Sequence, residues 1–407
     1  MTPQNATKHY KYYPDEANVP PYLAYGFRPI FLILPLYLAL SMLVWGFVFS
    51  GKLNLFSDPL SWHIYEMVFG VGIAGVMAFL FTGLPELFPG VIPVIGKRLK
   101  YIITLWILGR ISFWMMDIVG VYIVALLNIS LWVYVVYWAF KPVVLDPLQR
   151  HSSIGYAIVG MIVLQGLFFA SKLSIVDIDS LDILKLSLTA LMALILLALR
   201  RVNMEAINEI LEHKNLDDVY VAKAYRYNLA VFSVLLFGFV EFYYPTNSAL
   251  AWIGLAACAA ILGVINDYNL KFEPILKDPF TWYMISIFVM MALGYGLMGI
   301  SLMFDMGAES HFRHFISTGA FGITFFMVMV IVVYVHTGRV LGSRTWIGVG
   351  VLMLIISTLT RALIPLDYEK YNMLIGISML FWMIPYLLYF YKTRKFLLSP
   401  RVDGVKG

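Results

Sequence analysis

Two short segments carry the side chains best suited to bind a metal or haem iron. In the first, residues 61–67 (SWHIYEM), His63, Glu66 and Met67 follow helical spacing and share one face. That face offers an imidazole, a carboxylate and a thioether within about one turn. Imidazole is a common ligand of haem iron and of transition metals. We expect Ser61 to be the N-cap of this helix.

The second segment contains His311 and His314, about one turn apart, followed by the small-residue run 317–322. Small residues allow another helix or a flat cofactor to approach closely. His63 and His314 each begin an apolar helix, and we expect the two helices to run in the same direction. One metal site that uses His63 and His314 is therefore geometrically allowed, with His311 as a further candidate ligand.

His336 is a separate candidate metal ligand. It lies 22 residues after His314, which along a helix is roughly 33 Å, so one metal ion cannot bind both. The alternative for His336 is that it only caps carbonyls at a helix end. His63 and Glu66 also have a structural alternative, in which they only hydrogen-bond to each other or to a neighbouring helix.

Arg110 lies within an apolar stretch, where a charged side chain requires a partner. Asp117 is on a similar helical face, and Glu66 is at comparable depth. Either pairing would be structural. The other interpretation is that Arg110 holds the carboxylates of a cofactor such as haem, with Glu66 and Met67 as further cofactor-binding residues.

The composition sets the class of protein that must position these side chains. The chain has 407 residues, of which 61% are hydrophobic and 13% are charged. An ordinary soluble domain, in which roughly a quarter of residues are charged, is excluded, and the single cysteine excludes a disulfide scaffold. The net charge of +5 fits cationic loops of a membrane protein better than nucleic-acid binding. We therefore predict an all-α, polytopic helix bundle in a lipid bilayer.

Apolar stretches close to the roughly 20 residues needed to cross a bilayer indicate about twelve transmembrane helices. The predicted spans are 28–50, 61–83, 99–118, 119–140, 152–172, 181–200, 224–243, 247–266, 279–303, 312–335, 344–364 and 370–391. The weakest boundary separates the third and fourth spans, which are broken only by Met116, Asp117 and Gly120.

Positive charge predicts the orientation of the bundle. Most of the 29 Lys and Arg residues fall on the side of the two termini, while Lys185, Arg313 and Arg361 are among the few on the opposite side. The bias predicts that both termini are cytoplasmic. The predicted parts are a cytoplasmic N-terminal tail (1–27), a first six-helix half (28–200), a cytoplasmic connection (201–223), a second six-helix half (224–391) and a cytoplasmic C-terminal tail (392–407).

Six short motifs, in the correct order, resemble those of the NnrS family. They are 25–29 (YGFRP), 62–67 (WHIYEM), 106–110 (WILGR), 314–322 (HFISTGAFG), 336–339 (HTGR) and 400–404 (PRVDG). That family consists of haem- and copper-containing proteins of the bacterial inner membrane, with twelve helices and a link to the nitric-oxide response. The resemblance covers nearly the whole chain and implies haem b as cofactor and nitric oxide or another small diatomic molecule as ligand.

Two positions depart from the family pattern. The second histidine of the family's motif at 62–67 is Tyr65 here, and the predicted ninth helix, 279–303, contains no histidine. Two candidate ligand positions are therefore missing, whereas His63 and His314 still suffice for one haem iron. We predict that the chain binds haem b, and copper at well below one equivalent.

The leading hypothesis is an NnrS-like, haem-binding membrane protein that acts in the response to nitric oxide or respiratory stress. The sequence assigns no catalytic residue, so the question of an enzyme stays open. The alternative is a metal-free membrane transporter or an accessory subunit of a membrane assembly. We expect Gly294, Gly296 and Gly299 to allow close contact between helices, and faces of small residues also leave self-association open.

Overall fold

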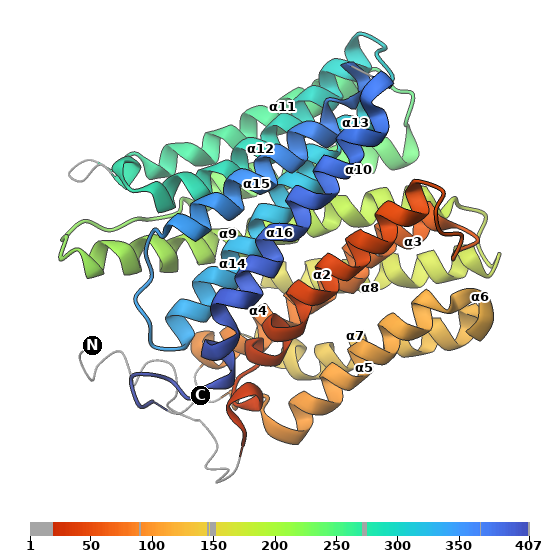
Figure 1. The fold of residues 1–407 in the computed structure, drawn as a ribbon. Coiled ribbons are helices and arrows are strands. Elements are labelled where there is room, and N and C mark those ends of the chain that lie inside the picture. The colour runs from red at the N-terminus through yellow and green to blue at the C-terminus, as the bar shows by residue number, and fades with distance from the viewer. Residues whose placement is uncertain are drawn as a thin grey trace.

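The structure, a computed structural model, describes residues 19–88, 91–144, 146, 152–270, 275–366 and 368–405. Residues 1–18 of the predicted N-terminal tail lie outside this part. The described residues form a helix bundle with no β-strand, which confirms the predicted fold class (Figure 1). The α-helices, in chain order, are α2 (Phe27–Phe49), α3 (Pro59–Tyr65), α4 (Gly72–Leu87), α5 (Gly96–Trp114), α6 (Met116–Val119), α7 (Val121–Val144), α8 (Ser152–Lys172), α9 (Ser180–His213), α10 (Ala224–Tyr243), α11 (Ala249–Ile265), α12 (Pro279–Met303), α13 (Glu309–Phe312), α14 (Phe321–His336), α15 (Thr345–Ala362) and α16 (Tyr371–Leu398).

Within the described residues, eleven helical segments are long and apolar enough to cross a membrane. The remaining predicted span corresponds to α5, which carries Lys97, Arg98 and Lys100 near its start and Arg110 further on. α5 packs along α7 like the other neighbouring helices of the bundle (Figure 1). The break between α5 and α7 contains the short α6 and Gly120, whose φ of +88° lets the chain turn.

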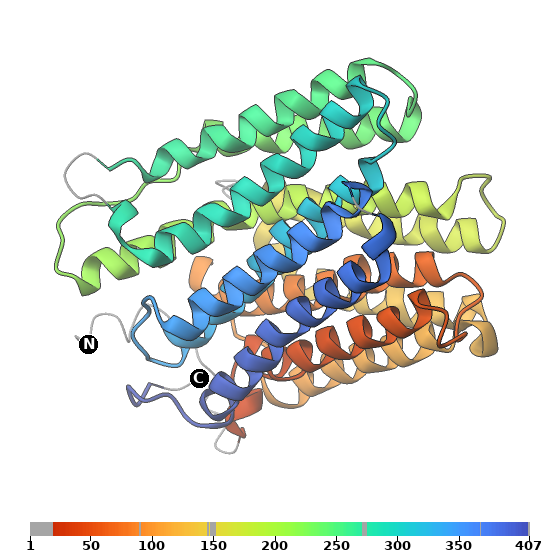
Figure 2. The same cartoon turned by 45° about the horizontal axis from the view of Figure 1, so that its top comes forward.

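Two helices are longer than the predicted spans. α9 has 34 residues and ends at His213. Residues 201–213 of the predicted connection 201–223 therefore continue the sixth span as helix. α16 continues to Leu398, beyond the predicted end at residue 391. α9 packs against α8, α10 and α14, and so contacts helices from both predicted halves (Figures 1 and 2).

The first and last long helices, α2 and α16, lie side by side (Figures 1 and 2). Arg28, near the start of α2, is buried, and its Nη1 donates to the backbone carbonyls of Phe396, Leu397 and Ser399 at 3.2, 3.1 and 2.8 Å. Carbonyls in the last turn of a helix have no hydrogen-bond donors within that helix, and the Arg28 guanidinium supplies the missing donor. The start of α2 and the end of α16 therefore lie at the same end of the bundle.

Two π-helical turns interrupt the α-helical pattern. One, Glu66–Val71 (η2), joins α3 to α4, and the other, Phe315–Ala320 (η5), precedes α14. A π turn holds more residues than an α turn and is frequent at functional sites. Each π turn follows closely after a candidate ligand, His63 in one case and His314 in the other. The spacing argument assumed regular α-helix and did not predict them.

Asp58, not Ser61, is the N-cap of α3, so the cap predicted from the sequence is wrong. Pro59 fits the first helical position, which places the cap one residue earlier. The Asp58 carboxylate accepts from the Ser61 backbone N–H at 3.1 Å and from Lys172 Nζ at 2.6 Å. Partial burial raises the pKa of the Asp58 carboxyl, but these hydrogen bonds outweigh it and hold that pKa below its usual value. The Ser61 hydroxyl lies 3.4 Å from Ser180 Oγ.

α11 and α12 pack backbone against backbone through glycine. A Cβ atom added to Gly254 would lie 2.8 Å from the Tyr295 carbonyl oxygen, and one added to Gly299 would lie 2.6 Å from the Ala251 carbonyl oxygen. Neither carbonyl can move without moving its helix. This contact confirms the role expected for Gly299 in close helix packing.

We predict that Gly299→Ala destabilises the protein, because the new methyl group must push α11 away from α12. Overpacking of this kind costs about 1–3 kcal/mol. Gly263→Ala on α11 is the matched control, since a Cβ there meets nothing within 4 Å. Thermal unfolding of the detergent-solubilised variants measures the difference. Equal melting temperatures for Gly299→Ala and Gly263→Ala would contradict the packing argument.

Candidate functional site

His63 and His314 line one cavity of about 400 Å³. Their helical segments begin at the same end of the bundle, opposite the end where α16 finishes (Figure 1). The cavity wall is mostly aliphatic and aromatic, with a small set of polar side chains. The lining residues include Met42, Trp45, Phe49, Leu60, His63, Ile64, Met67, Val68, Leu181, Leu184, Lys185, Leu188, Ser310, His311, Arg313, His314, Ser317, Thr318, Phe321, Arg361, Tyr371, Ile375 and Trp382. We call this space the histidine cavity.

His63 is oriented by ring packing. Its imidazole stacks on Trp45 of α2, with ring centroids 4.2 Å apart and planes inclined by 5°. Its Nδ1 is buried and has no hydrogen-bond partner among the described residues. A buried polar atom without a partner is uncommon in a folded protein. The orientation of His63 is therefore set by packing on Trp45, and its Nδ1 is left without a hydrogen bond among the described residues.

His314 is oriented by a hydrogen bond. Its Nδ1 lies 2.9 Å from the Ser310 carbonyl oxygen, which can only accept, so Nδ1 carries the proton. In the neutral ring, the lone pair then resides on Nε2. An imidazole fixed in this way through its other nitrogen is the usual arrangement of a histidine that binds a metal.

Glu66 and Arg110 form a buried ion pair that does not line the histidine cavity. Arg110 Nη1 donates to both carboxylate oxygens of Glu66, at 3.0 and 2.9 Å. Of the two partners suggested by the sequence, Glu66 is therefore the correct one. Asp117 accepts from the backbone N–H and the hydroxyl of Ser57, at 2.9 and 2.7 Å. Met67, by contrast, does line the cavity.

Neighbouring helices complete the hydrogen bonding of this pair. Tyr37 of α2 donates to Glu66, and Arg110 donates to Asn128 of α7. A Cβ atom on Gly70 would lie 2.6 Å from Arg110 Nη1, so the guanidinium occupies the space that glycine leaves. Nη1 and Nη2 of Arg110 are thus engaged by Glu66 and Asn128, and Arg110 is not among the residues that line the histidine cavity.

Tyr65, at the family's second histidine position, points into a separate aromatic cluster. Its ring stacks on Phe113, with centroids 3.8 Å apart, and Gln165 donates to its hydroxyl at 2.8 Å. Tyr65 is fully buried and is not part of the cavity wall. Tyr65 therefore contributes no side chain to the histidine cavity.

Three cationic side chains of the cavity wall were not identified as site residues from the sequence. They are Lys185, Arg313 and Arg361. Arg313 pairs with Glu241, with Nη1 and Oε2 3.2 Å apart. The charge distribution already placed these three residues on the side opposite the termini. Because His63 and His314 lie at that same end, this placement could have identified them as site residues.

Arg361 engages His311. Arg361 Nη1 donates to His311 Nδ1 at 2.8 Å, since a guanidinium can only donate. In the neutral ring the proton then lies on Nε2, so neither nitrogen of His311 offers a free lone pair. His311 lines the cavity but does not have the donor state that a metal ligand needs.

His336 lies at the other end of α14 and has different partners. Its Nδ1 is 3.1 Å from Glu86 Oε1, and its ring is near those of Tyr25 and Phe27, with centroids 5.9 and 5.7 Å away. Arg401 Nη1 donates to the His336 carbonyl at 2.7 Å. The structure thus separates His336 from His314, as their spacing predicts. Among the described residues, no three His, Cys, Asp or Glu side chains form a group that could hold a metal ion.

Comparison with known families gives one match. The family model described as NnrS protein matches residues 21–401. The matched region contains every candidate ligand discussed above. A search of curated proteins found no match.

We predict that Glu66→Gln strongly lowers stability, because it leaves the Arg110 guanidinium buried without a counter-charge. Removing one partner of a buried ion pair typically costs about 3–5 kcal/mol. Glu205→Gln is the control, because Glu205 forms an exposed pair with Arg201 and such pairs contribute little.

Thermal unfolding in detergent measures both variants. The double variant Glu66→Gln/Arg110→Gln should recover part of the loss, since no buried charge remains. If the Glu66→Gln protein unfolds at the same temperature as Glu205→Gln, the Glu66–Arg110 pair does not contribute the stability assigned to it.

Proposed function

The chain belongs to the NnrS protein family, and we propose that it is a membrane protein that binds one b-type haem between His63 and His314. We propose that it acts in the response to nitric oxide or respiratory stress. The observation that carries the haem proposal is the convergence of His63 and His314 on one cavity. Family membership alone supports the proposed role in the response to nitric oxide or respiratory stress.

The histidine cavity fits haem in size and lining. Sites for small molecules and cofactors usually measure about 300–1,000 Å³ and combine apolar walls with a few polar groups, and this cavity measures about 400 Å³. Aromatic side chains such as Trp45 and Phe321 suit a flat macrocycle. Haem iron is commonly held by histidine, and two histidines are present.

The two histidines have distinct roles in this proposal. His314 presents the Nε2 lone pair, because its Nδ1–H is engaged by Ser310. The His63 ring is stacked on Trp45, which fixes the direction of its edge. Its buried Nδ1 has no hydrogen-bond partner among the described residues. Bound haem would supply an iron atom that could take a diatomic ligand in place of one of the two imidazoles.

Cations of the cavity wall suit the carboxylates of the cofactor. Arg361 and Lys185 both line the cavity, and guanidinium and ammonium groups bind carboxylates through charge-assisted hydrogen bonds. We assign them this role in place of Arg110, which is committed to Glu66.

We further propose that both termini are cytoplasmic and that the histidine cavity lies toward the outer face of a bacterial inner membrane. The positive-charge bias supports this orientation. α3 and α13, which carry the cavity residues His63 and His311, lie toward the end of the bundle opposite the end of α16, and this arrangement supports the proposed orientation (Figure 1).

We predict that His63→Ala and His314→Ala each greatly reduce the haem content of the purified protein. Each would remove an imidazole that would hold the iron, and even a change beside a ligand typically lowers metal affinity by about 10–100-fold. The haem-to-protein ratio and the Soret band report the loss. Colourless wild-type protein would favour a metal-free transporter or accessory subunit instead.

His213→Ala and His336→Ala are the controls for this experiment. His213 is exposed at the end of α9, and His336 lies at the far end of α14 beside Glu86. Both variants should retain haem. Normal haem in His63→Ala and His314→Ala, together with loss in His336→Ala, would move the cofactor to the other end of the bundle.

We predict that copper binds at well below one equivalent. A copper site with nitrogen ligands usually needs several imidazoles held together. His336 faces Glu86, and His311 is engaged by Arg361. Elemental analysis of protein purified without added metal checks this. Stoichiometric copper that survives mild chelation would show that the ligands lie elsewhere.

A further inference from the structure

A second, smaller cavity lies next to the histidine cavity. It measures about 70 Å³ and is lined by side chains of α2, α4, α8, α9 and α14. We call it the apolar cavity. Its lining residues are Phe31, Gly72, Gly75, Val76, Phe79, Leu80, Ile154, Ile158, Leu191, Leu194, Ile195, Ala198, Leu199, Val202, Thr324, Phe325, Val328 and Met329.

The two cavities are stacked along the same helices. Val68, Leu188 and Phe321 line the histidine cavity, and residues three or four positions later on the same helical segments line the apolar cavity. Three or four residues correspond to one helical turn, or about 5 Å. One layer of side chains therefore separates the two spaces.

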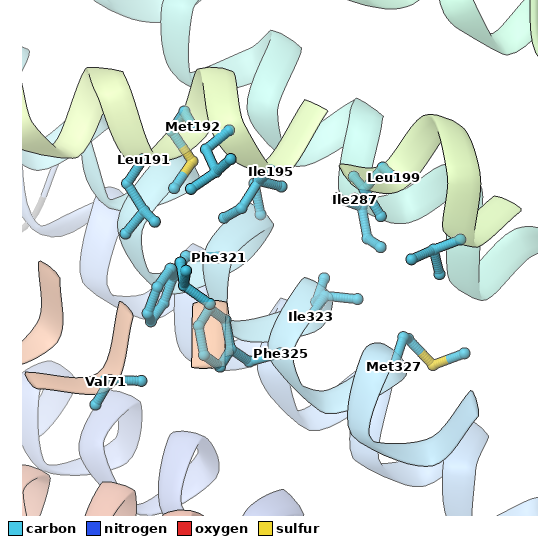
Figure 3. Close-up of a cluster of buried hydrophobic side chains, with 14 of the residues drawn as sticks. Val71, Leu191, Met192, Ile195, Leu199, Ile287, Phe321, Ile323, Phe325 and Met327 are labelled. Atoms are coloured by element: carbon cyan, nitrogen blue, oxygen red, sulfur yellow. The ribbon is translucent and has the colours of Figure 1, made fainter. Parts of the chain in front are cut away.

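Two phenylalanines form part of this layer. Phe321 belongs to the wall of the histidine cavity and Phe325 to that of the apolar cavity, and their ring centroids are 4.4 Å apart. Figure 3 shows both rings on α14, facing Leu191 and Ile195 on α9. The Phe321–Phe325 ring pair therefore lies where the two cavities approach each other.

The apolar cavity offers water at most one side-chain partner. Among the described residues of its wall, the one polar side chain is that of Thr324, whose hydroxyl donates to the Ala320 carbonyl at 2.6 Å and could therefore only accept from a guest. A buried water typically needs two to four polar partners, whereas cavities lined by Leu, Ile and Phe stay dry and bind xenon or small apolar molecules. The lining thus selects an apolar guest.

We propose that the apolar cavity is a docking site for one small apolar gas molecule, of the class that includes nitric oxide, carbon monoxide and dioxygen. Its small volume and dry wall favour such a guest. The site would hold the gas one helical turn from the histidine cavity. The role as a step toward iron rests on the proposed function, whereas the binding of a gas does not.

Xenon tests the binding directly. Crystals of the full-length protein under xenon pressure should show an anomalous peak within the apolar cavity. Val328→Phe, which projects from α14 into that cavity, should abolish the peak, and Ala198→Leu tests the same space from α9. Val133→Phe is the matched control, because Val133 is exposed on α7 and lines neither cavity.

Ligand kinetics test the role. In Val328→Phe and Ala198→Leu, recombination of carbon monoxide with the haem after photolysis should slow several-fold, with an unchanged Soret band and haem content. Val133→Phe should behave as wild type. Equal rates in all variants would overturn the role as a step toward iron.

The outcomes separate this inference from the proposed function. Wild-type protein that is red but binds no xenon in the cavity would overturn the docking site alone. Density for a lipid or detergent tail, or for ordered water, would also overturn it. Colourless protein with xenon bound would overturn the haem proposal and leave the docking site standing.

Discussion

The buried pair of Glu66 and Arg110 is the interaction on which the first part of the bundle depends. A charge in an apolar bundle must be paired and hydrogen-bonded, and this requirement draws together η2, α5, α2 through Tyr37, and α7 through Asn128. η2 immediately follows α3, which carries His63. The pair thus anchors the segment of α3 and η2 that forms one wall of the histidine cavity, although neither Glu66 nor Arg110 lines that cavity.

Much of the fold could be predicted because lipid solvation imposes a simple rule, that long apolar runs must be helices. The same rule showed that Arg110 needs an acidic partner and that Glu66 was a candidate. It also placed His63 and His314 at one end of the bundle and His336 at the other. These predictions depend on depth along a helix, which residue number measures directly.

Features that depend on rotation about a helix or on contacts between helices were not predicted. The π turns at 66–71 and 315–320 change which residues face the cavity, and their cause lies in tertiary packing. Arg361 approaches His311 only because α15 lies beside α13, and Glu86 meets His336 from another part of the chain. No spacing rule connects such pairs.

The clamp between Arg28 and the end of α16 bears on how the protein is made. Arg28 donates to carbonyls that lie 368 to 371 residues later in the chain. Because a protein is synthesised from its N-terminus, α2 exists before α16, and this contact can form only after residues 396–399 have been made. A chain cut before residue 396 would lack all three acceptors, and its Arg28 guanidinium would have none of these hydrogen bonds.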